Sequence, residues 1–108
     1  MKQKFIRIVP QAEIAISGKR ELDLDAFRAQ FDNDFNTLII TNTSTNSEGV
    51  GLFLDGIEVA HIDGNGGVFS FDWEFGMIFN FIALRNNSAG AVVTAQNCKV
   101  FVGRSGAK

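Results

Sequence analysis

The chain contains one histidine and one cysteine, His61 and Cys98, and a nucleophilic site would have to be built from them. Nucleophilic catalysis requires a nucleophile, a base within hydrogen-bond reach and a group that orients the base. No sequence feature brings His61 and Cys98 together. His61 falls at the end of a predicted hairpin strand, which favours a structural role, and a lone cysteine is most often a small buried side chain. We therefore predict no catalytic residues and expect that the protein is not an enzyme.

Metal-binding patterns are weak throughout the sequence. One histidine and one cysteine cannot complete a tetrahedral zinc site without carboxylates. Residues 63–67 (DGNGG) begin like a calcium loop, but Gly67 occupies the fifth position, where a ligand is needed. Residues 32–36 (DNDFN) offer more oxygen ligands, although this composition is also typical of a turn. We predict no bound metal and no cofactor.

The charge balance argues against one large class of partners. The chain has ten basic and twelve acidic residues, a formal net charge of -2 and a pI near 5.2. A protein that neutralises many phosphates carries a basic face, so we expect no specific nucleic-acid binding. Lys2, Lys4 and Arg7 could contact an anionic membrane surface, although dispersed basic residues are usually solvated. We expect no transmembrane segment and no signal peptide, and a single cysteine is typical of folding in a reducing cytoplasm.

The elements that would position these residues are strands. Alternating or β-branched apolar patterns predict strands over 4–9, 12–16, 21–25, 37–43, 50–54, 57–62, 69–75 and 77–85. Residues 91–95 and 99–102 form either one long broken strand or two short ones. The segment 27–35 is ambiguous, because Phe27, Phe31 and Phe35 have the spacing of a helix face, and a helical turn there stays open. About eight or nine short strands with turn residues between them indicate an all-β fold. We predict a β-sandwich, specifically a single jelly roll, as one domain over 1–108, with 1–9 as an arm or edge strand and 103–108 as a tail.

The strongest local signal is a hairpin over residues 50–62. Asp55 and Gly56 are the pair that a type I′ turn prefers. A two-residue loop sets three pairs opposite each other, and all six side chains would then share one face. The expected pairs are Leu54 with Ile57, Leu52 with Val59, and Val50 with His61.

The sequence has more apolar residues than the inner faces of one small sandwich require, including eleven phenylalanines. The segments 4–9 and 77–84 are apolar in both registers, so their second face needs cover from another chain. We therefore predict a self-associating subunit, in which the arm 2–9 can add to the sheet edge of a neighbour. The predicted interface residues are Phe5, Arg7, Val9, Phe69, Phe71, Trp73, Phe75, Phe79 and Phe81.

The alternative is a small carbohydrate- or ligand-binding β-sandwich module. Such modules often bind glycans on exposed aromatic platforms, and Trp73 shares an alternating face with Phe69, Phe71 and Phe75. Phenylalanine has no polar group and prefers burial, so this face is more typical of a core or a subunit contact.

One resemblance extends these expectations. The order of Leu38-Ile39-Ile40 with a Thr/Ser loop, the hairpin over 50–62 and the segment 67–71 (GVFSF) resembles small single jelly-roll structural proteins of bacteriophage virions. Members of such families form capsid vertices (pentons), minor capsid components or spike bases. The resemblance implies a non-enzymatic virion protein, made in the host cytoplasm, that assembles with itself and with other capsid proteins.

Overall fold

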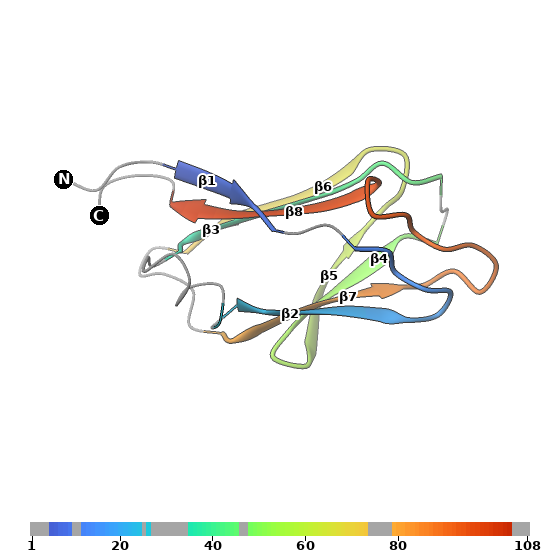
Figure 1. Ribbon diagram of the computed structural model, residues 1–108, viewed down its shortest axis with the longest axis horizontal. Coiled ribbons are helices and arrows are strands. Elements are labelled where there is room, and N and C mark those ends of the chain that lie inside the picture. Colours follow the sequence, from blue (N-terminus) through green and yellow to red (C-terminus); the bar gives the residue numbers. More distant parts are fainter. Residues whose placement is uncertain are drawn as a thin grey trace.

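The computed structural model describes residues 5–9, 12–24, 26, 35–45, 48–73 and 79–104. The described residues form eight strands (Figure 1): β1 (Phe5–Ile8), β2 (Lys19–Asp23), β3 (Thr37–Asn42), β4 (Val50–Leu54), β5 (Ile57–Ile62), β6 (Gly67–Asp72), β7 (Phe81–Asn86) and β8 (Cys98–Arg104). The all-β prediction is therefore confirmed.

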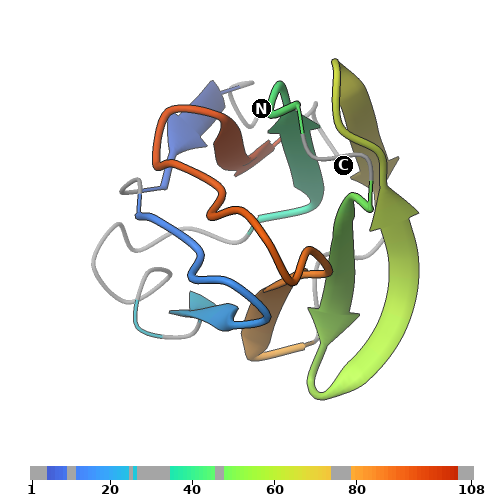
Figure 2. The same cartoon turned by 90° about the vertical axis from the view of Figure 1, so that its right-hand side faces the viewer.

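The strands form two antiparallel sheets that pack face to face. Sheet 1 has the order β1-β8-β3-β6 and sheet 2 the order β2-β7-β4-β5. Figure 2 shows the two layers end-on, with β5 and β6 together on one flank. Every connection between the described strands crosses from one sheet to the other, except the β4–β5 hairpin. This double Greek-key order is that of a jelly roll, as predicted.

Alternation along each central strand builds the core between the sheets. Leu38 and Ile40 on β3 point inward and are fully buried, and they meet Leu52 on β4 and Leu84 on β7. Val100 on β8 belongs to the same cluster. Burying each such side chain stabilises the fold by roughly 1.5–3 kcal/mol relative to exposing it, so this layer holds the two sheets together.

The β4–β5 hairpin has the predicted turn but a different register. Asp55 and Gly56 both have positive φ, at 49° and 85°, as a type I′ turn requires, and Leu54 pairs with Ile57 as predicted. The register then shifts between Leu52 and Phe53. Val59 is the extra residue of this β-bulge, so strand alternation changes phase beyond it.

The predicted pairs Leu52–Val59 and Val50–His61 are therefore wrong. Leu52 pairs with Ala60 and Val50 pairs with Ile62. Val59 and His61 are exposed, and Ala60 and Ile62 pack toward the core instead.

Several predicted boundaries also change. The predicted strand 12–16 is reduced to a single bridge between Ile14 and Val93. Strand β2 ends at Asp23, whose carboxylate accepts a hydrogen bond of 3.0 Å from the backbone N–H of Ala26. Strand β8 continues to Arg104, so Gly103 and Arg104 do not belong to the predicted tail. Residues 27–34 lie outside the described residues.

Candidate interaction surface

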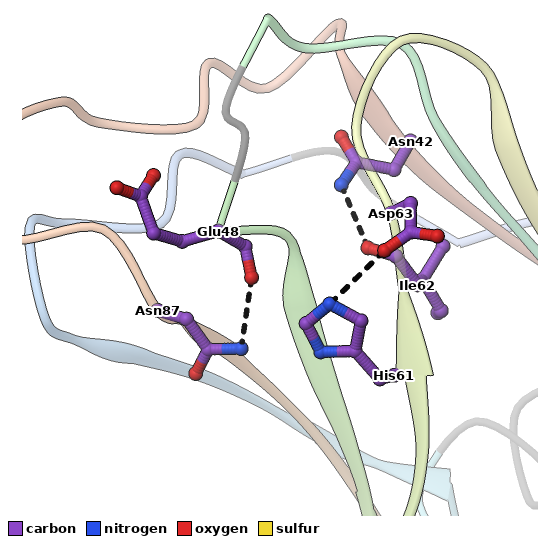
Figure 3. A network of polar contacts seen from close by, with 6 residues as sticks. All are labelled: Asn42, Glu48, His61, Ile62, Asp63 and Asn87. Carbon is purple, nitrogen blue, oxygen red and sulfur yellow. Dashed lines mark hydrogen bonds and ion pairs between the residues drawn. The ribbon is translucent and has the colours of Figure 1, made fainter.

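The two candidate nucleophilic residues lie in different environments. Cys98 is fully buried on the inner side of β8, where burial raises the pKa of its thiol to about 11, against an opposing effect of Arg20. His61 is half-exposed on the outer side of β5, and its Nε2 lies 3.2 Å from Oδ1 of Asp63 (Figure 3). His61 therefore lies on the outer face of sheet 2, whereas Cys98 lies on sheet 1 between the two sheets. The fold does not combine them into a nucleophilic pair.

The buried thiol gives a first prediction. At pH 8 we expect Cys98 to react with a thiol reagent at least about 100-fold more slowly than a surface cysteine introduced as Thr45→Cys, because the folded thiol is both inaccessible and protonated. Because the folded pKa lies above the ordinary value of 9.0, the unfolded chain ionises first, and stability falls as pH rises from about 9 to about 11. Stoichiometric modification of the native protein within minutes would contradict this.

Some of the candidate metal ligands lie among the described residues. Among the described residues, no group of three or more histidine, cysteine, aspartate or glutamate side chains could hold a metal ion. Asp63, the first residue of the calcium-like segment, lies beside His61. Asn36 of the predicted oxygen cluster is buried, and the other oxygen-bearing residues of that cluster, 32–34, lie outside the described residues.

One end of the sandwich is held by a motif that occurs twice. Strands β3 and β7 both end at this end, and both terminate in Asn-X-Ser, at Asn42 and Asn86. Both asparagines are fully buried. In each case the side-chain oxygen accepts the backbone N–H of the serine two residues later, over 3.1 Å from Ser44 and 3.0 Å from Ser88. Each asparagine therefore closes a local turn and leaves its amide nitrogen to bind neighbouring strands or loops.

The amide nitrogens connect distant parts of the chain. The Asn42 side chain donates to the carbonyl of Ile62 at the end of β5 (3.2 Å), as Figure 3 shows. Close to it, the Asn87 side chain donates to the carbonyl of Glu48 (3.5 Å). These bonds join the ends of β3 and β5 and tie the β3–β4 loop to the β7–β8 loop, so this end is an ordered structural element.

Gly49 in this network supports a second prediction. Its φ is +74°, and a Cβ built on it would lie 2.6 Å from Nε2 of His61 and 2.8 Å from the carbonyl oxygen of Ile62. Gly56 also has positive φ, but a Cβ there would meet nothing. We expect Gly49→Ala to lower the free energy of unfolding by about 3 kcal/mol and Gly56→Ala by about 1 kcal/mol, measured by urea denaturation. Equal losses in the two variants would show that the contact with His61 and Ile62 is unimportant.

The outer face of sheet 2 is charged. One cross-strand row contains Lys19, Arg85, Gly51 and His61, and the next contains Glu21, Ala83, Phe53 and Glu58. The five charged or titratable side chains of these rows are exposed, and the ammonium group of Lys19 lies 4.4 Å from the centre of the Phe53 ring. Such a face is well solvated, as is usual for one side of an antiparallel sheet.

The outer face of sheet 1 is different. Its central row contains Ile8, Phe101, Ile39 and Ser70, one from each strand. The adjacent row adds Lys99, Thr41 and Val68, and the opposite row Gly103, Thr37 and Asp72. Ile8 is 48% exposed and Val68 63% exposed. Among the residues named in these rows, only Lys99 and Asp72 carry charge, so the centre of this face is apolar.

Comparison with known proteins gave no match. No family model, no curated protein and no solved structure is significantly similar to the chain. Function must therefore be inferred from the surfaces of the protein. In the described part of the chain, no helix has the length and apolar composition needed to cross a membrane.

The predicted aromatic face is divided between core and surface. Phe69 is half-buried against the core. The Trp73 ring lies 4.7 Å from that of Phe71 and 5.2 Å from that of Phe79, between centroids, and it also packs on the core. Phe79 is buried, but Phe71 is half-exposed because β6 is an edge strand. Trp73 is thus held edge-on by its neighbours in a packed cluster.

The other predicted interface residues lie in three kinds of place. Val9 is in the core of the single chain. Phe81 is half-exposed on sheet 2, and Phe75 lies outside the described residues. Phe5 and Arg7 belong to β1, which pairs with β8 of its own sheet. Of the two alternatives predicted for residues 1–9, an arm or an edge strand, residues 5–8 form an edge strand.

Ile39 and Phe101, which the sequence reasoning missed, form the centre of the apolar face. The sequence does indicate a second apolar face on these strands, because 37–42 (TLIITN) and 98–104 (CKVFVGR) each carry apolar residues in both registers. What alternation alone could not show is that these two strands are neighbours.

Proposed function

We propose that the protein is a non-enzymatic structural subunit of a symmetric assembly. The observation that carries this proposal is the contrast between the two outer faces. Sheet 2 exposes two rows of charged side chains, with Phe81 and Val59 half-exposed beside them. Sheet 1 instead presents an uncharged row in which Ile8 is half-exposed and Phe101 and Ile39 are half-buried, with the exposed Val68 in the next row. Contiguous apolar surface that remains exposed on a single chain marks an interaction site.

The sheet 1 face is suited to contact with protein. β-Branched and aromatic side chains on a regular sheet form a stiff surface that loses little conformational entropy on packing. Interface centres are depleted of charge and surrounded by polar residues, which is the pattern formed here by Lys99 and Asp72 at the corners. The face therefore fits a permanent contact between subunits better than a solvent-exposed role.

The resemblance of residues 37–102 to small jelly-roll virion proteins makes the proposal more specific. We propose a bacteriophage capsid vertex, minor capsid or spike-base component, made in the host cytoplasm, with copies of itself and other capsid proteins as partners. The confirmed jelly-roll strand order supports this proposal, because viral capsid domains commonly have it.

The ligand-binding alternative is less favoured by the position of Trp73. Its ring packs against Phe71, Phe79 and the core, so it does not form an open flat platform. Trp73 is the only tryptophan, so its fluorescence reports directly on this cluster. A change in that fluorescence on titration with oligosaccharides would favour the binding module.

Electron microscopy of the concentrated protein tests the proposal. Closed particles or rings of one diameter are the expected result, because a structural subunit with a preferred contact angle closes on itself. The charged variant Ile39→Lys provides the comparison, since it should remove such particles. Fields of monomer-sized particles in both samples would contradict a self-assembling subunit.

A further inference from the structure

A sandwich of two open sheets has four edge strands, and three of them here are protected from pairing. The edges are β1 and β6 in sheet 1 and β2 and β5 in sheet 2. Strand β2 (KRELD) is charged at four of its five positions, and β5 contains the bulge at Val59. Strand β1 has four residues, including Arg7. Charge, bulges and short length are the devices by which proteins protect edges from adding further strands.

Strand β6 has almost none of these devices. Its sequence, GVFSFD, is neutral up to Asp72, and its register with β3 continues without a shift over all six residues. Val68 is 63% exposed and Phe71 50% exposed. The strand is therefore a regular, neutral and partly apolar edge.

The backbone groups that face the free edge can be identified. The N–H of Trp73 donates to the carbonyl of Asn36 over 2.8 Å, so this pair is of the hydrogen-bonded type. Antiparallel pairs alternate in type, so Phe71 and Phe69 also bond to β3. The N–H and C=O groups of Val68, Ser70 and Asp72 therefore point away from β3, toward the edge on which none of the described strands pairs.

We propose that β6 pairs antiparallel with β6 of a second copy, with Ser70 opposite the partner's Ser70. In this register Val68 lies opposite the partner's Asp72, and Asp72 lies opposite the partner's Val68. All three outward-facing residues are therefore members of hydrogen-bonded pairs. It places Phe69 beside the partner's Phe71, a favourable cross-strand aromatic pair that covers the half-exposed ring. It also sets no two like charges opposite each other.

The pairing extends the function proposed above, on which it rests. A twofold axis normal to the sheet joins the two copies of sheet 1 edge to edge and keeps their outer faces on the same side. The apolar centres around Ile39 and Phe101 then lie on one continuous sheet. The assembling unit is accordingly a dimer with a single broad apolar face.

Disulfide trapping tests the register. Ser70→Cys places two thiols on opposed residues about 5.5 Å apart between Cα atoms, within disulfide range, whereas Val68→Cys places its two copies about 14 Å apart. Under mild oxidation we expect a covalent dimer from Ser70→Cys at least ten times faster than from Val68→Cys. The wild-type chain is the control, because its only cysteine is buried. Equal rates in the two variants, or no cross-link in either, would overturn the proposal.

Charge substitution separates this inference from the proposed function. Ser70→Lys sets lysine against lysine across the paired edges, so dissociation of the dimer should increase at least tenfold, and Ser70→Thr should leave it unchanged. Because the Ser70 side chain also lies in the central row of the sheet 1 face, this loss supports the pairing only together with the Ser70→Cys cross-link. If Ser70→Lys has no effect while Ile39→Lys breaks up the assembly, the β6 pairing is wrong and the proposed function stands. If the wild-type chain is monomeric and neither substitution changes its mass, both fail.

Discussion

Asn86→Ala is expected to lower the free energy of unfolding by about 3–5 kcal/mol, close to the largest loss that a single polar side chain can cause. Asn86 is fully buried. Its amide nitrogen lies 2.8 Å from the carbonyl oxygen of Ala91, 3.3 Å from that of Ala15 and 3.4 Å from that of Ile14, and its oxygen accepts the N–H of Ser88. Alanine would remove this partner from the carbonyl of Ala91 and the N–H of Ser88. The carbonyls of Ile14 and Ala15 would keep their backbone hydrogen bonds from Val93 and Gly18. Each buried group that is left unsatisfied costs about 1–3 kcal/mol.

The neighbouring asparagine provides the control for that prediction. Asn87 makes a side-chain hydrogen bond of 3.5 Å at an exposed site, so Asn87→Ala should cost less than about 1 kcal/mol. Asn86→Asp keeps the shape but directs a second acceptor toward the carbonyls, and it should be at least as damaging as alanine. Urea denaturation monitored by Trp73 fluorescence measures all three. A loss below about 1 kcal/mol in Asn86→Ala would mean that the buried network does not hold this end of the sandwich.

Ile39→Lys is expected to weaken self-association by about 100-fold or more. Ile39 lies at the centre of the apolar face, with Phe101 and Ser70 beside it. A lysine there would bury an unpaired charge in the contact, and truncating or charging the centre of an interface has the largest effect on affinity. Sedimentation velocity over a concentration series measures the change.

The matched control is Phe53→Lys on sheet 2. Phe53 lies on β4, the third strand of sheet 2, as Ile39 lies on β3, the third strand of sheet 1, and both side chains are half-buried. Phe53, however, lies on the charged face. Both variants should lose similar monomer stability, whereas only Ile39→Lys should lose the assembly. Dissociation in both variants would point to general destabilisation and would remove the special role of the sheet 1 face.

The residue types at a turn were enough to predict the features of the fold that depend on a few neighbouring residues. The I′ turn at Asp55-Gly56 is confirmed because both residues tolerate positive φ. The carboxylate of Asp55 also accepts 2.9 Å hydrogen bonds from the N–H groups of Asn80 and Phe81, which no sequence pattern indicated. The bulge at Val59 was missed because the β5 sequence (IEVAHI) is apolar in both registers at its centre, so alternation could not distinguish the phases.

The candidate surface was harder to predict, because it is non-local. The sequence pattern predicts excess apolar surface at 4–9 and 77–84. The structure adds β3 and β8, whose outer residues Ile39 and Phe101 come together only because the jelly-roll order makes those strands neighbours. The Asn-X-Ser endings at Asn42 and Asn86 are visible in the sequence, but their importance comes from burial, which only the packed sheets create.

The most direct test of the proposed structural role is the solution mass of the purified chain, measured by light scattering from about 10 µM to about 1 mM, a range that detects both tight and weak association. We predict one discrete mass at high concentration that is an even multiple of 11.8 kDa, which decreases toward smaller units on dilution. A constant mass of 11.8 kDa over the whole range would contradict self-assembly through sheet 1 and its β6 edge.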